Sequence, residues 1–199
     1  MTQRTARILL ATGAALAGFV LCVTLVLLII GRAPVPNVPQ AAAIGGSFTL
    51  IDQDGRTVTD KDFRGKPLLV FFGFTHCPDF CPTTMFEISE IIKALGRDAD
   101  RVRAAFITID PERDTPAALK AYVSSFDPRI TALTGELEAI AAVAKSYRAI
   151  FRRVALAEGG YTMDHTVIVY LMGKDGRFIS PFSLKRTTAQ SAEELRKHI

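Results

Sequence analysis

Two cysteines and one histidine in this chain have the residue types and the spacing to bind a metal ion or to exchange electrons. Cys77 and Cys81 lie four residues apart, and a proline follows each of them. His165 is distant in sequence but comes directly before an apolar segment. Two thiolates and one imidazole suit copper or zinc. Soft thiolates fit three-coordinate Cu(I), whereas zinc requires a fourth ligand or an open position, so both metals stay open at this point.

The cysteine pair lies where a predicted strand is followed by a predicted helix. Residues 67–73 form a short apolar run that is typical of a buried strand, and residues 82–95 place apolar side chains at helical spacing. If the helix begins near Cys77, the two thiols lie on one face of its first turn. We then expect the positive end of the helix to lower the pKa of the thiols. Such a pair can share one metal ion or form a disulfide.

Of the three histidines, His165 is the one whose predicted position brings it near the thiols. It precedes a strand predicted over residues 166–172, and loops at the ends of neighbouring parallel strands meet at one edge of a sheet. A metal ligand and an ordinary loop histidine remain equally open interpretations. We expect His76 to point elsewhere along its turn and His198 to be exposed to solvent.

The residues beside these segments have ordinary structural interpretations. Asp110 ends a predicted strand and Asp114 precedes a helix cap, which are common positions for aspartate. Asp164 either orients the imidazole of His165 or fills a turn. Met163 is more consistent with core packing than with a soft auxiliary ligand. We therefore predict none of these four side chains as a metal ligand.

Strands and helices alternate along the rest of the chain. Residues 52–55 are typical of a hairpin turn. Further strands are predicted over residues 47–51, 56–59, 103–109, 130–133 and 177–180, and further helices over 115–126, 136–147 and 191–199. This order predicts a layered α/β domain with a mostly parallel central sheet and an antiparallel hairpin at its end. A cysteine pair between a strand and a helix is typical of thioredoxin-like folds.

The N-terminal part of the chain is apolar over a length that suits a membrane anchor. No charged residue occurs between Ile8 and Ile30, a run of 23 residues, and about 20 helical residues span a bilayer. The apolar region of a signal peptide is about 7–15 residues long, so an uncleaved anchor is favoured, with cleavage at residues 41–43 as the alternative. Arg4 and Arg7 precede the run, which predicts an inner-membrane protein with a cytoplasmic N-terminus and a periplasmic domain.

The chain therefore divides into three predicted parts. Residues 1–32 contain the cytoplasmic N-terminus and a membrane helix at about 8–30, residues 33–46 form a flexible linker, and residues 47–199 form the folded domain. The chain has 24 lysines and arginines against 20 aspartates and glutamates, but three of the arginines lie in the first part and no acidic residue precedes Asp52. The domain is thus nearly neutral, and we expect no nucleic-acid partner.

Three segments, in this order, carry a resemblance to a known family. They are FFGFTHCPDFCPTTM at residues 71–85, ITIDPERDTP at residues 107–116 and YTMDHTVIVYLM at residues 161–172. With them the chain resembles the Sco (SenC/PrrC) family of copper-binding assembly factors for cytochrome c oxidase, from about residue 45 to the C-terminus. The resemblance implies a thioredoxin-like α/β domain, and the predicted single N-terminal transmembrane helix fits it.

The resemblance also implies a copper ion, as Cu(I) or Cu(II), bound by Cys77, Cys81 and His165. It implies delivery of copper to the dinuclear copper site of oxidase subunit II, or reduction of the cysteines of that site. Subunit II, the membrane and other periplasmic copper chaperones are the partners that follow from it. Family members often have a smaller aliphatic residue where this chain has Phe80, which we expect to change the packing beneath the site.

Three functions are compatible with these residues. The favoured one is a copper metallochaperone, which requires His165. A thiol–disulfide oxidoreductase would use Cys77 and Cys81 as its catalytic residues, and a copper or redox sensor would bind a membrane partner without transfer. Thioredoxins have a CxxC spacing and a cis-proline facing the pair, whereas this chain has one more residue between the cysteines and no proline at the start of the facing strand. Both differences favour metal binding.

Overall fold

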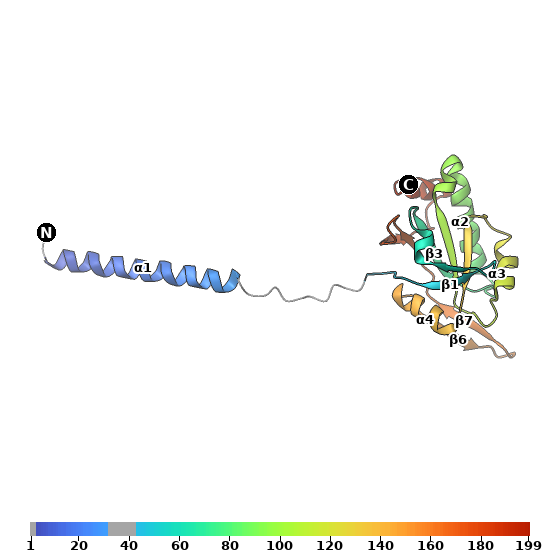
Figure 1. Ribbon diagram of the computed structural model, residues 1–199, viewed down its shortest axis with the longest axis horizontal. Coiled ribbons are helices and arrows are strands. Elements are labelled where there is room, and N and C mark those ends of the chain that lie inside the picture. The colour runs from blue at the N-terminus through green and yellow to red at the C-terminus, as the bar shows by residue number, and fades with distance from the viewer. Residues whose placement is uncertain (1–2, 32–42) are drawn as a thin grey trace. The chain divides into compact units, whose positions relative to one another are not determined.

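The computed structural model describes residues 3–31 and 43–199 of the chain (Figure 1). The chain separates into two units, and the first, Met1–Ala41, contains helix α1 (Gln3–Gly31). Among the described residues, no helix combines the length and the hydropathy that crossing a bilayer requires. The membrane helix over residues 8–30 stays a prediction, and most of the predicted linker over residues 33–46 lies outside the described residues.

The second unit, Ala42–Ile199, is built on a seven-stranded sheet with the strand order β2-β1-β5-β4-β3-β8-β9. Its strands are β1 (Thr49–Asp52), β2 (Thr57–Thr59), β3 (Leu68–Gly73), β4 (Arg103–Thr108), β5 (Ile130–Thr134), β8 (Val169–Met172) and β9 (Phe178–Phe182). Strand β3 reads LLVFFG and is buried at every residue, as expected for the centre of a sheet that is covered on both faces. Strand β1 alternates exposed and buried residues, which fits its place next to an edge.

The sheet is mixed, so the prediction of a mostly parallel sheet was wrong. Strand β3 pairs in parallel with β4, and β4 with β5, whereas β1, β2, β8 and β9 pair antiparallel with their neighbours. The parallel pairs are those whose strands are joined through a helix, because a parallel connection must cross back over the sheet. The antiparallel pairing of β8 with β3 places Val169 opposite Phe71. The start of β8 therefore lies beside the end of β3, the edge of the sheet that carries the cysteine pair.

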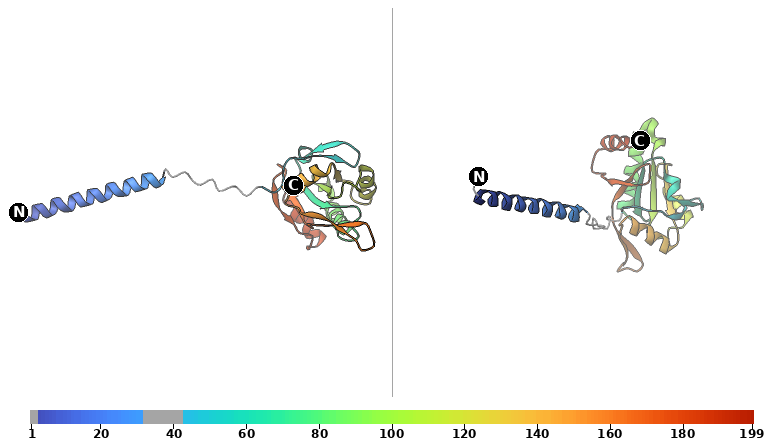
Figure 2. Two further views of the ribbon diagram at one scale, coloured as in Figure 1. Left: turned by 90° about the horizontal axis from the view of Figure 1, so that it is seen from below. Right: turned by 60° about the vertical axis from the view of Figure 1, so that its left-hand side comes forward.

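Helices pack on the sheet and complete the core. Those of the second unit are α2 (Phe80–Ala94), α3 (Pro116–Val123), α4 (Leu137–Ser146) and α5 (Thr188–Arg196), with 3-10 turns η1 (Asp60–Phe63) and η2 (Gly96–Arg101). Helices α2 and α5 lie side by side (Figures 1 and 2). Helix α3 begins as its sequence predicts: the Thr115 hydroxyl accepts a hydrogen bond from the amide of Ala118, and Pro116 is the first helical residue.

A two-stranded ribbon outside the main sheet is the element that sequence analysis did not predict. Strands β6 (Phe151–Ala155) and β7 (Tyr161–His165) pair antiparallel, with Phe151 opposite His165, and Figure 1 shows them projecting from the lower edge of the domain. Their residues mix apolar and charged side chains over only five positions, so the ribbon has no clear period in the sequence. His165 is thus the last residue of a strand, and the next strand begins only at Val169.

Candidate metal centre

The two cysteines lie on either side of the start of α2. The chain leaves β3 at Gly73, makes a turn that contains Cys77, and enters the helix at Phe80, so that Cys81 is its second residue. The helix thus begins after Cys77, so the condition that would place both thiols on its first turn is not met, and the helix predicted over residues 82–95 is confirmed with a slightly earlier start. Pro82 is the third residue of α2, where a proline is tolerated because the first amides of a helix have no partner within it.

The sulfur and nitrogen atoms of Cys77, Cys81 and His165 converge on one point. Their ligand atoms all lie within 4.8 Å of one another, and the Cys81 Sγ lies 3.7 Å from the His165 Nε2. The amide of Cys81 donates a hydrogen bond to the Cys77 Sγ over 3.4 Å, so this sulfur lies at the N-terminus of α2. Both thiols are free. Bonds of about 2.0–2.3 Å from three such atoms to a central ion separate the atoms by roughly 3.5–4 Å, which these distances approach.

Burial decides the protonation of Cys81. This side chain is fully buried, and its burial raises the pKa of the thiol, while a hydrogen bond with the backbone of Phe74 acts in the opposite direction. The expected lowering of the pKa by the helix end is therefore wrong for Cys81, because the loss of hydration outweighs the favourable field of the helix. The thiol keeps its proton until its sulfur coordinates a metal cation, so metal binding at this residue would release a proton.

The imidazole of His165 is oriented by the backbone. Its Nδ1 donates a hydrogen bond to the carbonyl of Thr166 over 3.1 Å, and because a carbonyl can only accept, the proton lies on Nδ1 and the lone pair on Nε2. The ring packs edge-on against Phe71 and Phe74, with centroids 6.2 and 5.9 Å away. Burial lowers the pKa of the imidazole, opposed by the Thr166 hydrogen bond and by the charge of Asp164, and so favours the neutral form that binds metals.

Asp164 neither orients the imidazole nor fills a turn, so both interpretations from the sequence were wrong: it lies within strand β7. Its carboxylate forms an ion pair with Arg152 over 2.8 Å at the surface of the β6–β7 ribbon. Adjacent residues of a strand point to opposite faces, so Asp164 faces away from the side on which His165 meets the cysteines. The carbonyl of Thr166 has the orienting role instead.

A buried carboxylate fixes the turn that carries Cys77. Asp114 is fully buried, and its Oδ2 accepts hydrogen bonds from the amide of Thr75 over 3.0 Å and from the hydroxyl of Thr108 over 2.6 Å. Its Oδ1 accepts from the hydroxyl of Thr75 over 2.6 Å. Thr75 belongs to the cysteine turn and Thr108 is the last residue of β4. Asp114 therefore holds the cysteine turn against the end of a central strand, a role that sequence analysis missed.

The same loop also holds the strand that carries the histidine. The guanidinium of Arg113 donates hydrogen bonds to the carboxylate of Asp110 and, over 3.1 Å, to the carbonyl of Tyr161, the first residue of β7. The Tyr161 hydroxyl donates to Asp110 over 2.9 Å. The guanidinium groups of Arg113 and Arg153 lie 3.9 and 4.0 Å from the centroid of the Tyr161 ring. Residues 110–114 thus connect both ligand-bearing segments, one through Asp114 and the other through Asp110 and Arg113.

The other residues considered from the sequence lie outside the centre. His76 is more than half exposed, and its Nδ1 lies 3.0 Å from the Thr75 hydroxyl. His198 is partly buried rather than exposed, with its Nε2 3.8 Å from a carboxylate oxygen of Glu194. Met163 is partly buried against the hydrophobic core, as predicted for a packing residue.

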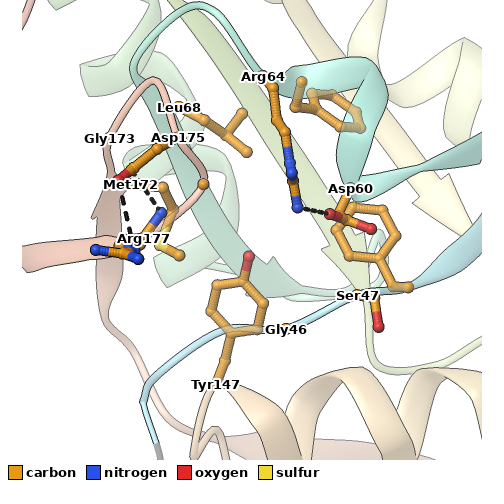
Figure 3. A pocket seen from close by; sticks show the side chains of 13 residues that line it. Gly46, Ser47, Asp60, Arg64, Leu68, Tyr147, Met172, Gly173, Asp175 and Arg177 are labelled. Carbon is orange, nitrogen blue, oxygen red and sulfur yellow. Dashed lines mark hydrogen bonds and ion pairs between the residues drawn. The ribbon is translucent and has the colours of Figure 1, made fainter.

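A cavity of about 400 Å³ lies at the other end of β3 from the cysteine turn and is separate from the metal centre (Figure 3). It is lined by Leu68 at the start of β3 and by Met172 at the end of β8. Its arginines already have partners: Arg64 pairs with Asp60 over 2.8 Å, and Arg177 lies 3.7 Å from Asp175. Among the described residues, no thiol or imidazole lines this cavity, and its carboxylates do not form a group that could hold a metal ion.

Comparison with known proteins places the chain in a family. The family profile described as SCO1/SenC matches residues 36–199. The mitochondrial SCO2 homolog of Bos taurus is 40% identical to this chain over 163 residues, which are 80% of this chain and 61% of that protein. The mitochondrial SCO1 homolog of Mus musculus is 39% identical over 78% of this chain and 56% of its own length. The chain belongs to the SCO1/SenC family. It spans less than two thirds of the length of these curated relatives.

Solved structures agree with this assignment. The structure of Bradyrhizobium japonicum ScoI with copper bound is 57% identical, with a TM-score of 0.76 over 79% of this chain and 100% of that chain. Arabidopsis thaliana ScoI with copper bound is 36% identical, with a TM-score of 0.73 over 78% of this chain and 98% of that chain. BsSco is 26% identical, with a TM-score of 0.62 over 79% of this chain and 94% of that chain. It is described as a member of the Sco family of cytochrome c oxidase assembly proteins, and a disulfide switch was identified in it. The predicted thioredoxin-like α/β fold is confirmed by these structures.

A methyl group at Gly73 would collide with the centre. A Cβ there would lie 2.7 Å from a ring carbon of Phe106 and 2.9 Å from the Cys81 Sγ. We expect Gly73→Ala to lower the free energy of unfolding by about 1–3 kcal/mol, as in other overpacked cores, and to weaken Cu(I) binding by displacing the sulfur. Denaturant unfolding and competition with a chromogenic Cu(I) chelator measure the two effects. Gly46→Ala, whose Cβ would make an ordinary 3.5 Å contact with Ser146, is the control, and full copper affinity in folded Gly73→Ala would contradict the prediction.

Removal of the buried carboxylate should loosen the cysteine turn. Asp114→Ala leaves the amide and hydroxyl of Thr75 and the hydroxyl of Thr108 without their acceptor, and we expect a loss of roughly 3 kcal/mol in the free energy of unfolding. Cu(I) affinity should fall with it, because Cys77 is no longer held in place. Glu112→Ala is the control on the same loop, since Glu112 is exposed and pairs only with Arg153 among the described residues. Equal copper affinities in the two variants would refute the positioning role of Asp114.

Proposed function

We propose that this protein is a copper metallochaperone that supplies the dinuclear copper site of cytochrome c oxidase subunit II. It binds one copper ion through Cys77, Cys81 and His165. The observation that carries the proposal is the convergence of these three ligand atoms within 4.8 Å of one another from two distant segments of the chain. ScoI of Bradyrhizobium japonicum, at 57% identity, binds copper, and BsSco belongs to a family of cytochrome c oxidase assembly proteins, which supports both the cargo and the recipient.

The composition of the centre favours copper over zinc. Two thiolates and one neutral imidazole form a soft, three-coordinate ligand set that suits Cu(I). Among the described residues, no further Cys, His, Asp or Glu side chain joins the three, so a structural zinc ion would lack its fourth ligand. Cys77 is only partly buried, so one side of the centre stays accessible. A partly accessible ion can be passed on by ligand exchange, which a closed structural site does not permit.

The proposal includes the position of the protein in the cell. The uncharged run between Ile8 and Ile30 anchors it in the inner membrane, with Arg4 and Arg7 in the cytoplasm and the metal centre in the periplasm. Alkaline phosphatase fused after residue 199 should be active, and the protein should stay in the membrane fraction after carbonate extraction. An inactive fusion or release by carbonate would refute the anchor while leaving the metal centre untouched.

Loss of the imidazole should weaken copper binding more than any surface change. We expect His165→Ala to lower Cu(I) affinity by at least about 100-fold, since even outer-shell changes at metal sites cost about 10–100-fold. Competition with a chromogenic Cu(I) chelator measures the affinity. His198→Ala is the control, because the ring of His198 lies near Glu194 of α5 and outside the centre. Equal affinities in wild type and His165→Ala would exclude His165 as a ligand.

Copper transfer tests the function itself. The full-length protein, loaded with one Cu(I), is mixed with the apo domain of oxidase subunit II whose cysteines are reduced. We expect copper to move to subunit II from the wild type and to be lost before transfer from His165→Ala. The alternative function, thiol–disulfide exchange, predicts no transfer but reduction of an oxidised subunit II domain by the metal-free protein, with Cys77 and Cys81 becoming a disulfide. That outcome would make copper a regulator of the thiols.

A further inference from the structure

An apolar groove opens directly beside the metal centre. It has a volume of about 590 Å³ and is lined by residues of the first half of α2 and of the β8–β9 hairpin. Its floor consists of the buried side chains of Phe71, Val169 and Phe182. Its walls include Phe80 and Val167, which are 61% and 48% exposed. Large apolar side chains that line a groove and remain exposed to solvent are typical of a surface to which another molecule binds.

The position of Phe80 corrects an expectation from the sequence. The sequence predicts that this residue changes the packing beneath the metal centre, but its ring is exposed and lines the groove. The reason is helical geometry: Phe80 and Cys81 are adjacent in α2, so their side chains point about 100° apart around the helix axis. With Cys81 turned into the core, Phe80 turns out towards solvent. The departure from the usual family residue is therefore on the surface of the protein.

The groove and the metal centre are connected through Phe71. Phe71 forms part of the groove floor and also packs against the ring of His165, with centroids 6.2 Å apart. Phe80 lies between the two cysteines in sequence, and Val167 lies two residues after His165. Any protein whose own side chains reach a copper ion bound here comes close to the groove, because metal–ligand bonds are only about 2 Å long.

We propose that this groove is the docking surface for the protein that exchanges copper with the centre, and that it receives a large apolar side chain of that partner. The inference rests on the proposed function. In the exchange, one bond from Cu(I) to a cysteine sulfur of this chain breaks as one bond from Cu(I) to the sulfur of a thiol of the partner forms. The proton of the partner's thiol passes to the released cysteine, and the copper ion stays Cu(I). The apolar contact positions the two ligand sets and excludes water from them.

Charges at the rim favour a protein over a lipid surface as the occupant. Asp79 and Glu87 line the groove, and within the described part of the chain neither carboxylate forms an ion pair. Of the described residues that line it, Lys185 is the basic one. The rim is therefore slightly acidic, which disfavours an anionic membrane surface and favours a partner with a basic side chain beside its apolar one.

Two phenylalanines of the same helix provide a matched test. Phe80 and Phe86 both belong to α2 and are 61% and 60% exposed, but Phe86 does not line the groove. In the full-length protein, Phe80→Ser should lower the second-order rate constant for Cu(I) transfer to the apo subunit II domain by about tenfold, as expected for an aromatic contact at the centre of an interface. Phe86→Ser should leave it within about twofold. Removal of Cu(I) by a small chelator, which needs no docking, should proceed equally in both variants and in wild type.

The outcomes separate docking from defects of the centre. A Phe80→Ser variant that transfers copper like Phe86→Ser overturns the proposal, and so does one that also loses copper faster to the chelator. A wild-type protein that forms a dimer in sedimentation, and a monomeric Phe80→Ser variant, would assign the groove to a second copy of this chain instead. If the wild-type protein transfers no copper, the proposed function fails. Calorimetric titration of the apo protein with the apo subunit II domain then tests the docking surface by itself. Binding that is lost in Phe80→Ser but kept in Phe86→Ser supports the groove as the docking surface, and equal binding by both variants refutes it.

Discussion

The metal centre of this protein depends on one buried carboxylate. A charged group in the interior is tolerated only when hydrogen bonds replace its hydration, and Asp114 obtains them from Thr75 and Thr108. This requirement works in both directions. The carboxylate needs the cysteine turn close by, and the turn, which has no regular structure of its own, is fixed by the carboxylate. Because Asp110 and Arg113 of the same loop also hold the start of β7, one short loop positions both the turn that carries Cys77 and the strand that carries His165.

Burial then sets the chemistry of the ligands. The raised pKa of Cys81 keeps this thiol protonated, and the lowered pKa of His165 keeps this imidazole neutral, so these two groups carry little charge in their apolar setting. Water cannot stabilise the negative charge of a free thiolate at this buried position, but a soft cation can, so the cation displaces the thiol proton. The exchange of a proton for a copper ion keeps the net charge of Cys81 and its ligand constant.

The two sides of the centre differ in a way that suits a carrier. On the inner side, Cys81, Phe71 and Phe74 are fully buried, and they fix one sulfur and the imidazole by close packing. On the outer side, Cys77 is partly buried and Phe80 is exposed over an apolar groove. The inner side provides a fixed geometry for the ion, and the outer side provides a route by which another protein can reach it. The cavity at the other end of β3, with its paired charges, takes no part in this arrangement.

The sequence by itself determined the class of fold and the soft chemistry of Cys77, Cys81 and His165, because strand and helix periods and residue types are local properties, but it left open whether His165 joins the cysteines. It also placed Thr115 and Pro116 at the start of α3, since capping depends on neighbouring residues alone. The tertiary structure decided what depends on contacts between distant segments: the mixed sheet, the β6–β7 ribbon, and the buried partners that Asp110 and Asp114 find across the chain. It also decided the direction of the pKa shift at Cys81 and the outward position of Phe80. Burial and side-chain direction arise only when the elements pack, so no local pattern in the sequence contains them.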